Sequence, residues 1–219
     1  MRLVWTALVA LLPAAGATQQ VQFGIEAGVP VTQFLSAFPP NRFDTYVPHT
    51  GRYIAGVTTE ARLTRRVSVG VEALFRHGSY DNGGFQPCCA DFASHTNVRD
   101  WEFPVLARYH LRAERRVSVF VTAGAAVDWL QHMKQVTVVS YYYGGSSVSD
   151  NSQPVELSQR VVAGIVAGGG VDAHLHRVHL EPEFRYTFWT QRHFGASESS
   201  NYGLFSNRNQ AEVLLEIKF

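Results

Sequence analysis

Eight stretches of the chain alternate apolar and polar side chains with a period of two residues. This period is typical of β-strands with one apolar and one polar face, because successive side chains of a strand point to opposite sides. A chain of 219 residues is long enough for one undivided barrel domain. The pattern predicts an all-β fold of eight antiparallel strands, over residues 21–31, 52–63, 67–76, 100–111, 117–129, 160–174, 178–188 and 211–219.

The connections between these strands alternate between long and short. The long ones are residues 32–50, 78–97, 131–157 and 191–208, and the short ones are residues 64–66, 112–115 and 176–177. A soluble β-sandwich has no reason to sort its loops in this way, whereas outer-membrane barrels have short periplasmic turns and long extracellular loops. The order of the connections therefore predicts an up-and-down transmembrane barrel with both termini on the periplasmic side.

The third long connection is expected to be partly regular. Its first part, Val136–Tyr143, is strand-like and would extend a hairpin above the membrane. The glycines, serines and asparagine in residues 144–152 are typical of a mobile tip. The other three long connections carry prolines, glycines and asparagines and are predicted to be loops without regular structure.

The charged side chains of the predicted strands fall on the polar parity, and the apolar parity is uncharged through its middle. A membrane barrel turns its apolar face to lipid and its polar face inward, the reverse of a soluble barrel. Small residues mixed with acids and arginines suit a narrow interior in which charges pair. The predicted interior ionic network comprises Glu26, Glu60, Arg62, Glu72, Arg76, Glu102, Arg108, Asp128, Asp172, Glu181, Glu183, Arg185, Glu212, Glu216 and Lys218.

The first seventeen residues have the features of a secretory signal peptide. Arg2 precedes an apolar run, Pro13 breaks it, and Ala15–Ala17 offers the small residues that a signal peptidase needs. We therefore predict that residues 1–17 are cleaved and that residues 18–219 form the barrel domain. The apolar run is too short to span a bilayer as a helix.

The chain ends on an aromatic residue of the apolar parity, Phe219. Together with the segment Trp101–Tyr109 and the glycines 168–170, this ending resembles the small bacterial outer-membrane β-barrel superfamily, which includes OmpA-like, OmpX-like and opacity proteins. The resemblance covers nearly all of residues 18–219 and implies an outer-membrane location in contact with lipid. It also implies that Phe219 is a recognition signal for the barrel-assembly machinery.

The sequence carries weak signals for chemistry. His77 and Ser79 share one parity near the outer end of a strand, as a lipid-modifying barrel hydrolase would require, but no matched acid is identifiable. His174, His176 and His179 flank a predicted periplasmic turn, where solvated histidines are expected rather than a metal site. We therefore expect no catalytic, metal or cofactor site.

The adjacent cysteines, Cys88 and Cys89, cannot staple distant segments, and three states stay open for them: a vicinal disulfide, pairing between molecules or free thiols. A net charge of +1 implies no nucleic-acid partner.

We expect a non-enzymatic envelope protein whose exposed loops contact a surface ligand. An eight-stranded interior is only wide enough for its own side chains, so the pore should be plugged. Two alternatives are a lipid-modifying barrel enzyme acting through His77, and a secreted soluble barrel that binds an apolar ligand. Protease treatment of whole cells should cut near Phe43, Phe92, Tyr142 and Tyr202 if the orientation is right.

Overall fold

The computed structural model describes residues 21–37, 44–86, 89–111, 117–154, 156–175, 178–195 and 203–219. No helix in these ranges is long and apolar enough to cross a membrane. The strands are β1 (Val21–Pro30), β2 (Leu35–Ala37), β3 (Asp44–Arg62), β4 (Val67–Gln86), β5 (Ala90–His110), β6 (Val117–Tyr141), β7 (Ser146–Asn151), β8 (Val161–Leu175), β9 (Val178–Trp189), β10 (Leu204–Ser206) and β11 (Asn209–Lys218). The predicted signal peptide, residues 1–17, lies outside the described residues.

Eight of these strands close into an antiparallel barrel, which confirms the predicted fold class. Neighbouring strands follow the order β5-β4-β3-β1-β11-β9-β8-β6, and β6 pairs with β5 to close the ring. The first and last barrel strands pair from Gly24 opposite Lys218 to Pro30 opposite Glu212. Because every barrel strand has a partner on both sides, the ring has no open edge within the membrane.

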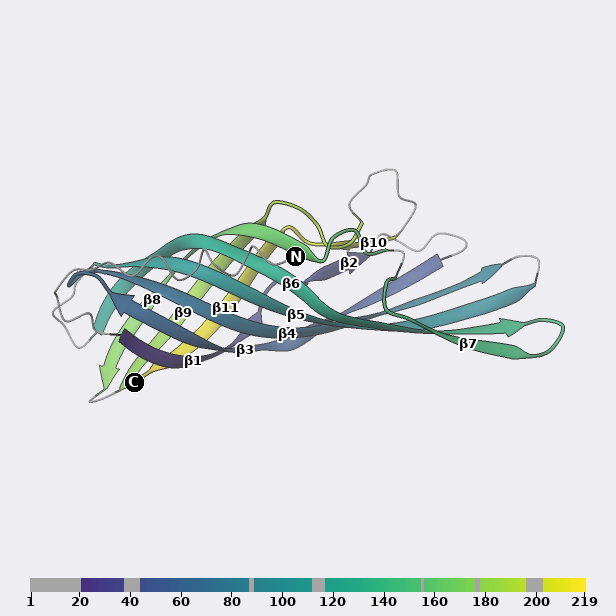
Figure 1. Cartoon of the computed structure of the whole chain (residues 1–219), viewed down its shortest axis with the longest axis horizontal. Coiled ribbons are helices and arrows are strands. Elements are labelled where there is room, and N and C mark those ends of the chain that lie inside the picture. Colours follow the sequence, from purple (N-terminus) through teal and green to yellow (C-terminus); the bar gives the residue numbers. More distant parts are fainter. Residues whose placement is uncertain are drawn as a thin grey trace, which may run out of the picture.

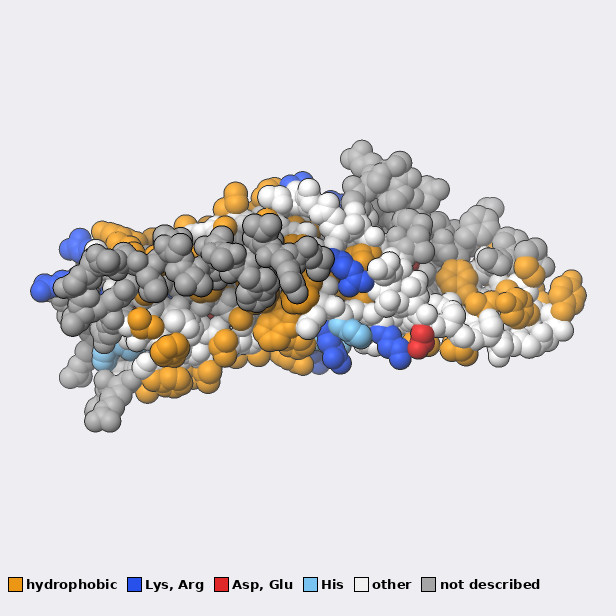
Figure 2. All heavy atoms as spheres, viewed as in Figure 1, with side chains coloured by type: hydrophobic (Ala, Val, Ile, Leu, Met, Phe, Trp, Pro, Cys, Tyr) orange, Lys and Arg blue, Asp and Glu red, His pale blue; other side chains and the backbone are white. Residues whose placement is uncertain are grey.

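The apolar parity points outward and the polar parity points inward. Phe23 is 62% exposed and Ile165 is 63% exposed, whereas Arg185 and Lys218 are completely buried. Figure 2 shows hydrophobic side chains over much of the visible barrel wall. This arrangement suits a barrel surrounded by lipid, and it is the reverse of a soluble barrel that stores an apolar ligand.

Strands β3 to β6 continue far past the outer ends of β8, β9 and β11, as Figure 1 shows. The prediction of an irregular loop over residues 78–97 is wrong, because β4 and β5 stay paired from Gly78 opposite Val98 to Gln86 opposite Ala90. Residues 44–50, also predicted as loop, pair with β4. Backbone hydrogen bonds between the long strands override the local turn propensity of this segment.

The predicted extension of β6 is confirmed, because the strand runs to Tyr141. The tip is shorter than predicted, however, since Ser146–Asn151 form strand β7 and pair with β6. The reversal falls at Gly144 and Gly145, whose φ angles of 99° and 93° favour glycine.

Two irregularities in the ladder mark the outer rim of the barrel. Pairing of β3 with β4 shifts between Thr50 and Ile54, and pairing of β5 with β6 shifts between Arg99 and Asp100. Both shifts lie at the level of His77 on β4, which pairs with Arg99. Bulges at barrel rims bend the strands locally, and here they separate the barrel from its extracellular extension.

The prediction of loops without regular structure over residues 32–50 and 191–208 is also wrong for short stretches, because β2 and β10 form among their described residues. Residues Leu204–Ser206 form β10, which pairs with β2 in a small sheet of its own. Phe194 bridges to Leu157. The small sheet of β2 and β10 and the segments around Leu157 and Phe194 meet at the outer end of the barrel. Together they form the cap.

Candidate functional site

The barrel interior collects the charged side chains that the sequence places on the polar parity. All fifteen members of the predicted network are buried except Arg62, which is only partly buried and forms no ion pair with the described residues. This concentration of buried charge makes the interior a candidate functional site.

Arg108, on β5, is at the centre of the largest cluster. Its Nη1 lies 2.7 Å from carboxylate oxygens of both Glu60 and Glu216, and Lys218 forms ion pairs with the same two carboxylates. Three further carboxylates contact Arg108 at 3.0–3.3 Å, and these belong to Glu72, Glu181 and Glu183. Carboxylates from four strands, β3, β4, β9 and β11, thus converge on the one guanidinium group that β5 contributes to the interior.

Two other arginines continue the network toward the outer end. Arg185 contacts Glu72 at 2.7 Å, Glu183 at 3.1 Å and Glu26 at 3.5 Å. Arg76 forms ion pairs with Glu102 and, at 2.6 Å, with Glu212. It also donates a hydrogen bond of 2.7 Å to Gln210 Oε1.

Acidic side chains outnumber basic ones in this interior. The buried set contains twelve aspartates and glutamates but only three arginines and one lysine, with His110, His179 and His193 as further bases. An excess of carboxylates makes the local potential negative, so the interior favours cations and disfavours anions.

His193 joins the cap to the barrel wall. Its Nε2 lies 3.1 Å from Asp128 Oδ2 and its Nδ1 lies 2.8 Å from the carbonyl oxygen of Gln159. A carbonyl oxygen and an ionised carboxylate both accept hydrogen bonds, so these two partners favour the imidazolium form of His193. Burial alone would lower the pKa of His193, but the hydrogen bond and charge of Asp128 outweigh burial and raise it.

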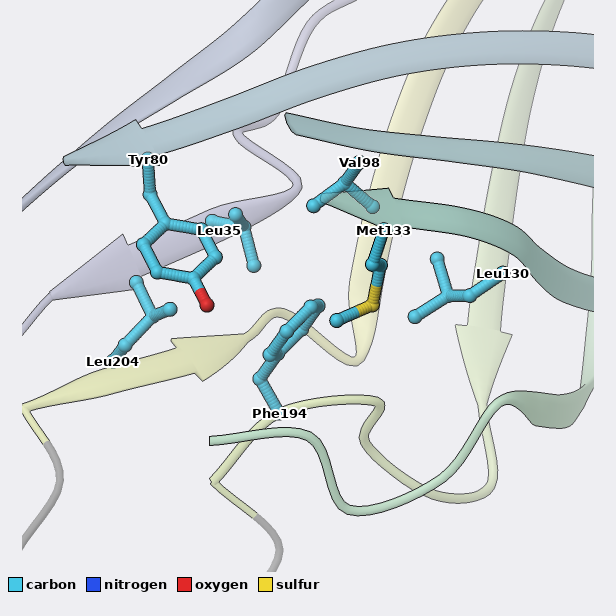
Figure 3. Close-up of a cluster of buried hydrophobic side chains, with 7 residues drawn as sticks. All are labelled: Leu35, Tyr80, Val98, Leu130, Met133, Phe194 and Leu204. Carbon is cyan, nitrogen blue, oxygen red and sulfur yellow. The ribbon is translucent and has the colours of Figure 1, made fainter. Parts of the chain in front are cut away.

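The cap covers a cluster of apolar side chains at the outer mouth. These side chains come from the barrel rim and from the cap segments, as Figure 3 shows, and they are Leu35, Tyr80, Val98, Leu130, Met133, Phe194 and Leu204. Glu156 accepts hydrogen bonds from Tyr46 Oη at 3.1 Å and from Tyr80 Oη at 3.4 Å. Burial, reinforced by the charge of Glu156, raises the pKa of Tyr80, so its phenol stays neutral and donates.

Comparison with known proteins agrees with this architecture. The sequence profile of the family described as "Outer membrane protein beta-barrel domain" matches residues 16–188. The chain belongs to this family. It is therefore a bacterial outer-membrane protein, and no significant match to a curated protein sequence was found.

Several solved structures resemble this outer-membrane barrel. OprG from Pseudomonas aeruginosa is 11% identical, with a TM-score of 0.50, and the match covers 91% of this chain and 94% of that chain. Ail, the attachment invasion locus protein of Yersinia pestis, is 10% identical (TM-score 0.41, covering 90% and 95%). The protease OmpT from Escherichia coli is 9% identical (TM-score 0.36, covering 91% of each chain). At 11% identity, the similarity to OprG is evidence for a shared fold only.

Of the residues singled out for chemistry, His77 and Ser79 lie outside the interior of the outer-membrane barrel. The expectation of solvated histidines is wrong for His179, which is buried in the interior and contacts Asp172 at 2.9 Å. His77 and Ser79 are both on the outward parity of β4 and partly exposed, and no hydrogen bond between them is found among the described residues. His176 and Cys88 lie outside the described residues, while Cys89 is disulfide-bonded. Phe219 is 64% exposed, and its backbone N–H donates to Phe23 O at 3.0 Å.

Sequence reasoning missed several buried polar residues of this outer-membrane barrel, and Asp100, Glu156 and His193 are three of them. Asp100 is on the same parity as Glu102 and is buried, so applying the parity rule to the first residue of the predicted strand 100–111 would have found it. Glu156 and His193 lie in segments that were predicted to be loops, and no local sequence pattern predicts that the cap buries them.

Proposed function

We propose that this protein is a non-enzymatic outer-membrane barrel that anchors a stiff extracellular sheet for contact with other surfaces. The observation that carries the proposal is the extension of β3 to β7 beyond the outer rim. From Gln131 to Tyr141 alone, β6 continues for eleven residues, which corresponds to about 35 Å at the usual rise of a strand.

The end of this extension exposes apolar and aromatic side chains. Tyr143 is 93% exposed and Val148 is 68% exposed, and both lie in the hairpin of β6 and β7. Figure 2 shows hydrophobic side chains at the far end of the extension, beyond a polar zone with basic side chains near the rim. Exposed apolar and aromatic groups of this kind are typical of contact surfaces.

The filled interior argues against a transport role. Side chains from all eight strands occupy the barrel, and the apolar cluster beneath the cap lies across its outer mouth. We expect the refolded protein to show no stable open channel in planar lipid bilayers. Phe194→Ala, which removes a ring from the centre of the cluster, should produce brief openings, whereas a steady open current from the unmodified protein would contradict a plugged interior.

Adhesion of whole cells tests the contact role. Cells of a laboratory strain that display the protein should adhere to polystyrene more strongly than cells that carry an empty vector. The double variant Tyr143→Ser, Val148→Ser should lose most of this difference, while the control Ser147→Ala, Ser149→Ala on the same hairpin should keep it. Equal adhesion by displaying cells and vector cells would remove the proposal, provided that protease treatment shows the hairpin at the cell surface.

We also propose that the last strand binds the barrel-assembly machinery through Phe219. Its side chain projects from the lipid-facing parity at the end of β11 and is available to a partner before the barrel closes against β1. Phe219→Ser should lower the amount of folded protein in the outer membrane, whereas refolding in detergent should be unaffected.

A further inference from the structure

The periplasmic end of the interior brings two histidines and two carboxylates together on one hairpin. His174 on β8 pairs directly with His179 on β9. Asp172 and Glu181 lie two residues further along the same two strands, on the same parity. Side chains of directly opposed residues start about 4.5–5.5 Å apart. The four side chains therefore form a block at the periplasmic mouth, with Asp172, His179 and Glu181 buried and His174 at its exposed edge.

The ligand atoms of this block converge. One ligand atom each from Asp172, His179 and Glu181 lies within 4.8 Å of the other two, and all three side chains are buried. The rings of His174 and His179 meet edge to face with their centroids 4.2 Å apart. A tetrahedral ion with ligands at about 2.0–2.2 Å needs ligand atoms separated by roughly 3.4 Å, so small side-chain rotations complete the site.

We propose that Asp172, His174, His179 and Glu181 bind a divalent transition-metal ion of the zinc type. Imidazole nitrogens and carboxylate oxygens are the ligands that Zn²⁺ and its neighbours accept in proteins. The excess of buried carboxylates in the interior adds a negative potential that attracts such an ion. Two imidazoles beside two carboxylates select a transition metal over Ca²⁺ or Mg²⁺, which prefer oxygen ligands alone.

The surroundings of the block suit a bound ion. Glu181 Oε2 accepts hydrogen bonds from Lys218 at 2.7 Å and Arg108 at 3.3 Å, while its Oε1 has no hydrogen-bond partner among the described residues. One oxygen is thus held by the ionic network and the other is left for a metal, as ligands oriented by outer-shell partners usually are. His179 Nδ1 already contacts Asp172 Oδ1 at 2.9 Å, and each side chain keeps 10% exposure toward the periplasmic mouth. An ion can therefore enter from the periplasm.

Zinc binding to the untagged barrel, refolded in detergent micelles, tests the site. Equilibrium dialysis against ZnCl₂ should give one ion per barrel, and CoCl₂ should give the intense visible absorption of four-coordinate cobalt. His179→Ala and Asp172→Asn should each weaken zinc binding at least about tenfold. The heat-dependent gel shift shows whether each variant is folded. If His179→Ala does not fold, zinc binding is measured instead on His174→Ala, which changes the exposed edge of the block.

The matched control is a second group of two histidines and one aspartate on the same protein. His49 and His95 flank Asp81 on the extracellular extension, and all three are about half exposed. The variant His49→Ala, His95→Ala should bind zinc as the unmodified barrel does. Failure of the unmodified barrel to bind zinc, or loss of binding only in this control variant, would overturn the proposal.

Discussion

The barrel and its extracellular extension use similar ion pairs in opposite surroundings. In the barrel, Arg108 and its five carboxylates are almost completely removed from solvent. In the extension, His49 and His95 bond to Asp81 at 3.1 Å and 2.5 Å while about half of each side chain stays exposed. Surface pairs contribute little to stability, whereas breaking a buried network leaves charges without compensation. We therefore expect the loss of stability on breaking an ion pair to depend on how deeply the pair is buried, rather than on how many pairs the region contains.

The largest effect is expected at Arg108. Arg108→Gln would leave five buried carboxylates without their shared cation, and removal of one partner from a buried ion pair costs about 3–5 kcal/mol. We expect the free energy of unfolding to fall by at least this amount, or the barrel not to fold. Urea titration followed by the heat-dependent gel shift measures the change.

Arg99→Gln is the matched control for this prediction. Arg99 lies at the rim on the same strand, β5, and its side chain is exposed. The substitution should change the free energy of unfolding by less than about 0.5 kcal/mol. Equal losses of stability in the two variants would show that burial does not separate the two regions.

An intermediate effect is expected at the boundary, where His193 joins the cap to Asp128. A raised pKa in the folded state means that the stabilisation is fully present below the unfolded pKa of about 6.5 and is lost as pH rises through the folded value. The cap should therefore open more readily in alkaline solution. Hydrogen exchange of residues 190–195, followed between pH 6 and pH 9, should show protection that falls faster than the intrinsic rates predict.

His193→Gln separates this mechanism from general loosening of the barrel. Glutamine can occupy the site but does not titrate, so the pH dependence should disappear while the cap loses about 1.5–3 kcal/mol, the contribution of hydrogen bonds to a charged group. Protection of the barrel strands should not change. A pH dependence that survives in His193→Gln would assign the effect to another group.

The two regions also differ in how far the sequence predicts them. In the barrel, the alternating pattern allows only two arrangements, with the apolar face of each strand pointing either inward or outward. Charged residues such as Glu72 and Arg185, which share one parity, indicate which of the two the barrel adopts. In the extension, Asp81–Gly84 has the composition of a turn yet lies within β4, because pairing with β3 and β5 supplies its hydrogen bonds. The contact of His193 with Asp128 joins residues 65 positions apart, so no local pattern encodes it.

The smallest effect is expected at Asp81, on the exposed side of the comparison. The hydrogen bond with His95 lowers the pKa of Asp81 more than its slight burial raises it, and His49 adds to the lowering. This stabilisation is present above the unfolded pKa of about 3.9 and is lost as pH falls through the folded value. Because the three side chains are exposed, Asp81→Asn should cost less than about 1 kcal/mol and should leave the unfolding midpoint of the barrel unchanged.

Limited proteolysis of the extension at neutral pH should be slightly faster in the variant, and at pH 3 the two proteins should be cut at equal rates. A shifted barrel midpoint would mean that the extension and the barrel unfold as one unit, so that exposed pairs beyond the rim contribute to the stability of the membrane-spanning part.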